Sequence, residues 1–192
     1  MTLFGRAVKV VGISLTGRDD MKIKVDEYQE RARETAIYPG KLLYPTLGLA
    51  GETGELLEAI LEEFDGTSKE IGDILWYVAN VAHDADLKLS ECTGTKTFPN
   101  GKRIIWTISY EMLPQRVGKI AECVKKAYRD NNGELSEERR SKIREQLKKL
   151  VKDLAAIAYN EHTTLDAVAK ENLLKLKSRQ DRGVLKGDGD NR

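Results

Sequence analysis

The helical spacing of apolar residues in two adjacent segments is the strongest constraint on how this chain can fold. Between residues 46 and 64, and again between residues 67 and 86, apolar side chains recur at intervals of three and four. Only the short Asp65–Thr67 link separates the two segments. We therefore expect two antiparallel neighbouring helices, each burying one apolar stripe.

Further helical patterns fill much of the remaining chain. They begin near Val25 and cover approximately residues 109–129, 136–158 and 164–176. Capping residues are expected at three of the helix starts: Ser136, Thr164 or Asp166, and Thr67 with Glu70 as a T-x-x-E capping box. The predicted fold class is all-α, an antiparallel helical bundle.

The chain divides into five predicted parts. The Pro99-Asn100-Gly101 sequence between apolar flanks indicates a hairpin-like turn between two helical halves. The parts are an N-terminal arm without helical period at 1–20, a first half at 21–91, a hairpin-like linker at 92–108, a second half at 109–176, and a basic, Gly-rich tail at 177–192.

Composition excludes several classes of protein. The 192 residues are 40% hydrophobic and 33% charged, which suits one helical domain and not a disordered chain. A net charge of +1 provides no general attraction to nucleic acid, and no apolar run is long enough to span a membrane. The two cysteines, Cys92 and Cys123, form no CxxC motif. A cytoplasmic protein with reduced cysteines is the expectation.

Two pairs of acids accompany glycines in the first half. Glu52 and Glu55 are three residues apart, as are Glu70 and Asp73, so each pair shares one helix face. Nearby glycines lower helix propensity by roughly 1 kcal/mol each and would let the backbones approach closely. These glycines are Gly48, Gly51, Gly54 and Gly72.

Facing acid pairs favour a bound cation. Four crowded carboxylates repel one another and partly protonate unless a counter-ion binds. A hard divalent cation with oxygen ligands removes the repulsion, and Mg²⁺ suits a site of carboxylates, water and substrate phosphate. The alternative is an ordinary solvated helix face, because the chain has 31 acids, and Glu70 could be only a capping residue.

The second half repeats the apolar pattern of the first without its acids. Gly54-Glu55-Leu56 aligns with Gly118-Lys119-Ile120, and the segment from Glu70 aligns with the segment from Gln146. At the acid positions Glu52 aligns with Arg116, Glu55 with Lys119, Glu70 with Gln146 and Asp73 with Lys149. The prediction is a degenerate second helix pair that holds no cation; chance similarity between amphipathic helices is the alternative.

Three stretches resemble a known family. YQERARETAIYP, LLYPTLGLAGETGELLE and KEIGDILWYVANVA resemble the MazG-like, all-α nucleotide pyrophosphohydrolases, and the C-terminal residues resemble the end of its short members. The resemblance covers about residues 28–91 and 165–192. It departs from the family in one respect, because here the acids lie in the first half and the tail closes the second.

The resemblance implies an activity and a ligand set. It implies Mg²⁺-dependent hydrolysis of a nucleoside triphosphate to the monophosphate and pyrophosphate. Glu52, Glu55, Glu70 and Asp73 would bind the metal, and one glutamate could act as the base. Asn172 and Lys175 match an Asn-x-x-Lys that reaches the nucleotide in the family; an ordinary exposed pair is the alternative.

Further substrate contacts are predicted from position. Tyr77 and Asn80 share the polar stripe of the second acid helix, while Arg179 and Arg182 could grip phosphates if the tail closes. A solvated basic tail is the alternative for each arginine. The helices are expected to bury their remaining stripes in a homodimer. The alternative function is a catalytically weak nucleotide-binding protein or a helical scaffold.

Overall fold

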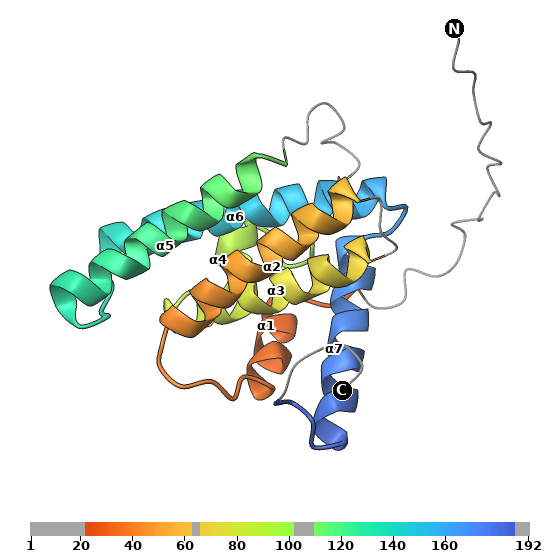
Figure 1. Ribbon diagram of the computed structural model, residues 1–192, viewed down its shortest axis with the longest axis horizontal. Coiled ribbons are helices and arrows are strands. Elements are labelled where there is room, and N and C mark those ends of the chain that lie inside the picture. The colour runs from red at the N-terminus through yellow and green to blue at the C-terminus, as the bar shows by residue number, and fades with distance from the viewer. Residues whose placement is uncertain (1–21, 63–65, 102–109, 187–192) are drawn as a thin grey trace, which may run out of the picture.

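The protein is described by a computed structural model, which covers residues 22–62, 66–101 and 110–186 (Figure 1). The arm predicted at 1–20 lies outside these ranges, as do residues 102–108 of the linker and 187–192 of the tail. The helices are α1 (Val25–Glu34), α2 (Leu43–Leu61), α3 (Thr67–Asp84), α4 (Leu89–Thr93), α5 (Met112–Asn131), α6 (Glu137–Asn160) and α7 (Leu165–Asp181). The predicted all-α fold is confirmed.

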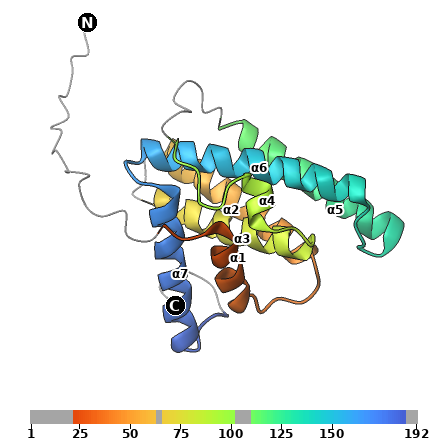
Figure 2. The same cartoon turned by 180° about the vertical axis from the view of Figure 1, so that it is seen from behind.

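Four long helices form the body of the molecule. Helix α2 packs on α3 and α5, and α6 packs on α5 and α3, so each helix of one pair contacts the other pair. Helix α7 runs across one end of this bundle against α3, while α1 and α4 cover α3 and α6 from behind (Figures 1 and 2). This crossing is important for function because it carries polar residues of α7 to the acid helix α3.

A single apolar cluster joins both helix pairs. Its fully buried side chains recur at helical spacing, as the sequence predicts. Among the largest are Leu49, Leu56, Ile71, Leu75, Ile120 and Leu150. The internal repeat is compatible with this packing and stays a prediction.

The helix starts confirm two predicted caps and contradict one. Ser136 accepts a hydrogen bond from the backbone of Arg139 at 3.3 Å, and Thr164 accepts one from Ala167 at 3.1 Å. The capping box at Thr67 is wrong, because Thr67 is the first residue of α3 and its N-cap is Gly66, which has no side-chain capping bond. The carboxylate of Glu70 lies instead in the acid cluster with Glu52 and Glu55.

Two boundaries differ from the prediction. The sequence analysis missed α4, which crosses the border drawn between 91 and 92 and is held by bonds from the Ser90 backbone and hydroxyl to Asp26 at 2.7 and 2.8 Å. Helix α7 extends beyond 176 to Asp181 because Arg179 in its last turn is also buried. The predicted tail therefore begins inside a helix.

The described part of the linker pairs with the start of the chain. Thr97 forms an isolated antiparallel bridge with Lys24, and the backbone of Val25 donates to the carbonyl of Lys96 at 3.1 Å. The hairpin-like turn predicted at Pro99-Asn100-Gly101 stays a prediction, because the flank that follows it lies outside the described residues. In the ranges that the structure covers, no helix combines the length and the apolar character needed to cross a bilayer.

Candidate functional site

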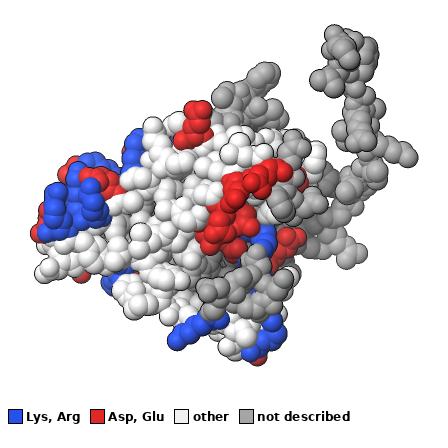
Figure 3. All heavy atoms as spheres, in the orientation of Figure 1, with Lys and Arg blue, Asp and Glu red and all other residues white. Residues whose placement is uncertain are grey.

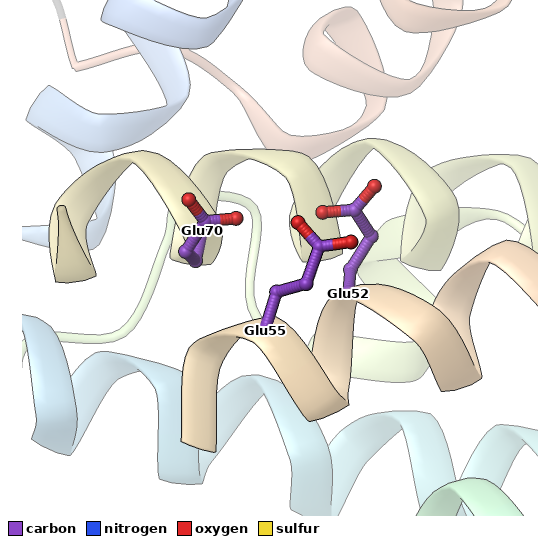
Figure 4. A group of neighbouring side chains, drawn as sticks. All are labelled: Glu52, Glu55 and Glu70. Atoms are coloured by element: carbon purple, nitrogen blue, oxygen red, sulfur yellow. The ribbon is translucent and has the colours of Figure 1, made fainter. Parts of the chain in front are cut away.

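Three predicted ligands converge between α2 and α3. Glu52 and Glu55 extend from successive turns of α2, Glu70 extends from the first turn of α3, and their carboxylates turn toward one another (Figure 4). One carboxylate oxygen from each residue lies within 4.8 Å of the other two. The predicted antiparallel arrangement therefore brings acids from both helices to one place.

The electrostatics of the cluster favour a cation. Burial and, to a smaller extent, the charges of Asp73, Glu55 and Glu70 together raise the pKa of Glu52 to about 8, with the charge of Lys175 acting in the opposite direction. A carboxyl group with this pKa holds a proton near neutral pH until a positive charge replaces it. Carboxylate oxygens at this spacing, from the half-buried Glu52 and Glu70 and the exposed Glu55, fit a hard divalent cation such as Mg²⁺.

The fourth predicted ligand, Asp73, is held by α7. It follows Glu70 by three residues, and its charge acts on Glu52, but Lys175 Nζ lies 2.7 Å from its Oδ2 atom. Asn172 also donates its amide to Asp73 Oδ1 at 3.3 Å. The structure thus brings the predicted Asn172 and Lys175 to the acid site and pairs both with one of its carboxylates.

Tyr28 of α1 stabilises the contact between Asn172 and Asp73. Its hydroxyl donates to Asn172 Oδ1 at 2.9 Å, which orients the Asn172 amide nitrogen toward Asp73. Burial raises the pKa of Tyr28, with the Asp73 charge adding to the effect, so the hydroxyl stays a donor. The sequence pattern assigns Tyr28 no role at this site, since nothing in the spacing shows that α1 and α7 meet.

Two of the four glycines have close neighbours, but these are side chains and not the backbones that the prediction names. A Cβ atom on Gly48 would lie 2.1 Å from the ring of Tyr77, and one on Gly72 would lie 3.2 Å from Asn172 Cβ. The prediction is wrong for Gly51 and Gly54, where an added Cβ meets nothing within 4 Å. Those two glycines face outward from α2, so close packing does not require them.

Aromatic rings adjoin the acid cluster. Tyr77 lies over Gly48, and burial raises its pKa, with the charges of Tyr44 and Glu52 adding to the effect. Its ring centroid is 6.4 Å from that of the half-exposed Tyr44, which stacks on Tyr38 at 4.8 Å. The sequence analysis missed Tyr38 and Tyr44; their positions on either side of the Pro39-Gly40 turn were the available signal.

Asn80 belongs to a separate buried network. It is 1% exposed, donates to the Trp76 carbonyl at 2.8 Å and accepts from the Tyr38 hydroxyl at 3.3 Å. Asp84, one turn on, accepts from Tyr38 and from the Leu42 backbone at 3.1 and 2.8 Å. Asn80 therefore supports the aromatic residues, and its direct contact with a substrate stays a prediction.

The predicted arginines lie near the end of α7. Arg179 is buried and Arg182 is exposed, with its Nε donating to the Ser178 carbonyl at 3.3 Å. Arg182 is seven residues beyond Lys175, roughly 10 Å along the helix axis. Their contact with phosphate stays a prediction.

A cleft of about 480 Å³ lies between the start of α3 and α7, and none of the four predicted acids lines it. Asn172 and Lys175 line it, together with Lys69 and Gly72. Its volume falls within the range of ordinary small-molecule sites. Acidic side chains gather over α2 and α3 near this end, whereas Lys and Arg gather at the far end of α5 and α6 (Figure 3).

Comparisons with known proteins agree with this site. A family model described as the MazG nucleotide pyrophosphohydrolase domain matches residues 44–95, which contain all four predicted acids. The chain is 41% identical over 89 residues to the Gene 37 protein of Mycobacterium phage L5, and this alignment covers 36% of the chain and 78% of that protein. No solved structure is a significant match.

Proposed function

The chain belongs to the MazG nucleotide pyrophosphohydrolase family, and from this premise we propose that it hydrolyses a nucleoside triphosphate to the monophosphate and pyrophosphate with Mg²⁺. The observation that carries the proposal is the convergence of Glu52, Glu55 and Glu70 within 4.8 Å. Such a cluster is electrostatically costly without a cation.

The proposed metal ligands are these glutamates and Asp73. Bound there, Mg²⁺ would lower the pKa of a water and neutralise charge on the phosphates. One of the glutamates, with Glu55 as the first candidate, would accept a proton from the attacking water in place of binding the metal. The water oxygen bonds to the α-phosphorus, the bond from that phosphorus to the bridging oxygen breaks, and pyrophosphate leaves with that oxygen.

The cleft and the aromatic residues supply the proposed substrate contacts. Lys175 and Asn172 line the cleft, so both can bond phosphate oxygens there. Tyr77, on which the charge of Glu52 acts, and the neighbouring Tyr44 would offer ring faces and hydroxyls to a nucleoside. Arg179 and Arg182 remain proposed phosphate contacts from the end of α7.

A homodimer is part of the proposal. The outer face of α2 exposes Leu43, Leu47 and Leu61 at 47%, 66% and 82%. An exposed apolar stripe of this kind is typical of an association surface. Light scattering of the purified protein measures the oligomeric state directly.

Substitution of one ligand tests the activity. Glu55→Gln keeps the size of the side chain and removes a charge, so we expect turnover to fall by about 100-fold. The measurement is pyrophosphate release from a panel of ribo- and deoxyribonucleoside triphosphates, with and without Mg²⁺. Glu58→Gln is the matched control, because Glu58 is an exposed acid one turn further along α2 and lies outside the cluster.

Each outcome decides between the alternatives. Turnover unchanged in Glu55→Gln, with thermal stability equal to that of wild type, refutes the site. No release from any triphosphate in the wild-type protein leaves a nucleotide-binding or scaffold role in place of the enzyme. Nucleotide with Mg²⁺ raises the melting temperature in the binding role and leaves it unchanged in the scaffold role.

A further inference from the structure

The ion pair of Asp73 and Lys175 separates Asp73 from the other acids. Lys175 Nζ contacts both carboxylate oxygens, and Asn172 donates to one of them. The two side chains are only 19% and 22% exposed, so water screens the pair weakly. Both oxygens of Asp73 are thus occupied by partners from α7, while Glu52, Glu55 and Glu70 point to one another.

Asp73 can join a shared cation only if Lys175 moves. Glu70 and Asp73 lie on the same face of α3, and the charge of Asp73 already acts on Glu52. A lysine amine and a metal ion in contact with the same carboxylate compete, because like charges repel at close range. Lys175 therefore occupies a place that the complete metal site requires.

The cleft gives Lys175 a second position. Lys175 lines the cavity beside α3, where anionic phosphates are proposed to bind. Its ammonium group sits on a flexible four-carbon stem and bonds phosphate as readily as carboxylate. Asn172 is fixed more firmly than Lys175, because Tyr28 bonds it and Gly72 packs against it.

We propose that in the nucleotide-free protein Lys175 pairs with Asp73 and so keeps Asp73 from binding the metal. The substrate phosphates then attract Lys175, and Asp73 becomes able to bind the metal. The inference rests on the proposed function and concerns how the site is completed. Nucleotide and metal then increase each other's affinity, as linkage requires. The protein binds Mg²⁺ weakly alone and completes its ligand set only with substrate present.

Calorimetric titration with Mg²⁺ alone tests whether Lys175 blocks metal binding by Asp73. Lys175→Met keeps the apolar stem and removes the charge, so Asp73 becomes available and the Mg²⁺ affinity rises by about 10-fold. Lys177→Met is the matched control, since Lys177 lies on the same helix, is exposed and pairs with Asp181. The control changes the affinity by less than about twofold.

A double-mutant cycle distinguishes the blocking of Asp73 by Lys175 from a general repulsion between Lys175 and the cation. In an Asp73→Asn background the carboxylate that pairs with Lys175 is absent. Lys175→Met then changes the Mg²⁺ affinity by less than about twofold. An equal increase in both backgrounds overturns the proposal, because it shows a general charge effect. An affinity that is unchanged or lower in Lys175→Met overturns it as well.

A non-hydrolysable nucleotide completes the test. An α,β-methylene triphosphate should raise the Mg²⁺ affinity of the wild type more than that of Lys175→Met, because Asp73 is already free of Lys175 in the variant. An equal rise in both proteins contradicts the release of Asp73 by phosphate binding. Mg²⁺ binding without turnover refutes the proposed function but does not contradict the blocking of Asp73 by Lys175. Turnover by the wild type, without tighter Mg²⁺ binding in Lys175→Met, refutes only the blocking role of Lys175. Absence of Mg²⁺ binding in every variant refutes both this role and the proposed function.

Discussion

The helix pairs α2–α3 and α5–α6 pack in the same bundle but differ in how they treat charge. In the first pair three carboxylates lie within 4.8 Å of one another, and the pKa of Glu52 is about 8. In the second pair Arg116 forms an ion pair with Asp153 across α5 and α6, with side chains only 13% and 20% exposed. One pair concentrates like charges, whereas the other neutralises its charges.

The predicted repeat aligns these differences position by position. Arg116 corresponds to Glu52, and the same offsets place Asp153 opposite Tyr77 and Met112 opposite Gly48. In this predicted alignment, the positions of Glu52 and Tyr77 are those of Arg116 and Asp153, which form an internal salt bridge. The comparison teaches that the apolar positions suffice for packing, while a few polar positions decide which pair can hold a cation.

The largest expected effect comes from breaking the salt bridge of the second pair. Arg116→Met leaves the Asp153 carboxylate half-buried without its guanidinium, and burial already raises the pKa of Asp153. We expect a loss of about 2 kcal/mol in the free energy of unfolding, measured by urea denaturation.

Lys125→Met provides the control on the same helix. Lys125 forms an exposed pair with Glu122, so the expected loss is below about 0.5 kcal/mol. Equal losses in the two variants would mean that the second pair does not depend on internal neutralisation, and the contrast with the first pair would fail.

The next effect sharpens the role of small residues in the first pair. Gly48→Ala places a methyl group 2.1 Å from the Tyr77 ring, so overpacking should lower the free energy of unfolding by about 1–2 kcal/mol. Gly54→Ala meets open space and should raise it by roughly 0.5–1 kcal/mol through helix propensity. Thermal or urea unfolding measures both; a stabilising Gly48→Ala contradicts the packing of Tyr77 on α2.

The smallest effect is the pH dependence of the metal-free protein. The pKa of Glu52 is raised in the folded state to about 8, so the folded protein binds a proton more tightly than the unfolded chain. This contribution to stability is fully present below the unfolded pKa of 4.5 and is lost as pH rises through about 8. Because Glu52 is only half-buried, solvent screening keeps the change small.

Melting temperatures at pH 5 and pH 9 measure the effect. The wild-type protein should lose more stability over this interval than Glu52→Gln, which cannot ionise at the position, and Mg²⁺ should reduce the loss in the wild type. Equal losses in the two proteins contradict the coupling of Glu52 with the acid cluster.

Local patterns in the sequence predict much of the site. The three-residue spacing of Glu52 and Glu55 and the short link before α3 suffice to place acids from two helices face to face. They do not separate Asp73 from the three glutamates, because that depends on Lys175, 102 residues further along the chain. Spacing along one helix carries no information about which distant helix crosses it.

The amino-acid sequence by itself determined the all-α class, most helix bounds and the family, because helical period, caps and motif spacing are local properties. Only the tertiary structure decided how α7 crosses α3, which bonds Tyr28 and Asn172 make beneath Asp73, and which glycines touch a neighbour. These contacts follow from how apolar stripes of separate helices pack together, and the ridges and grooves that set such crossings involve side chains from the whole chain.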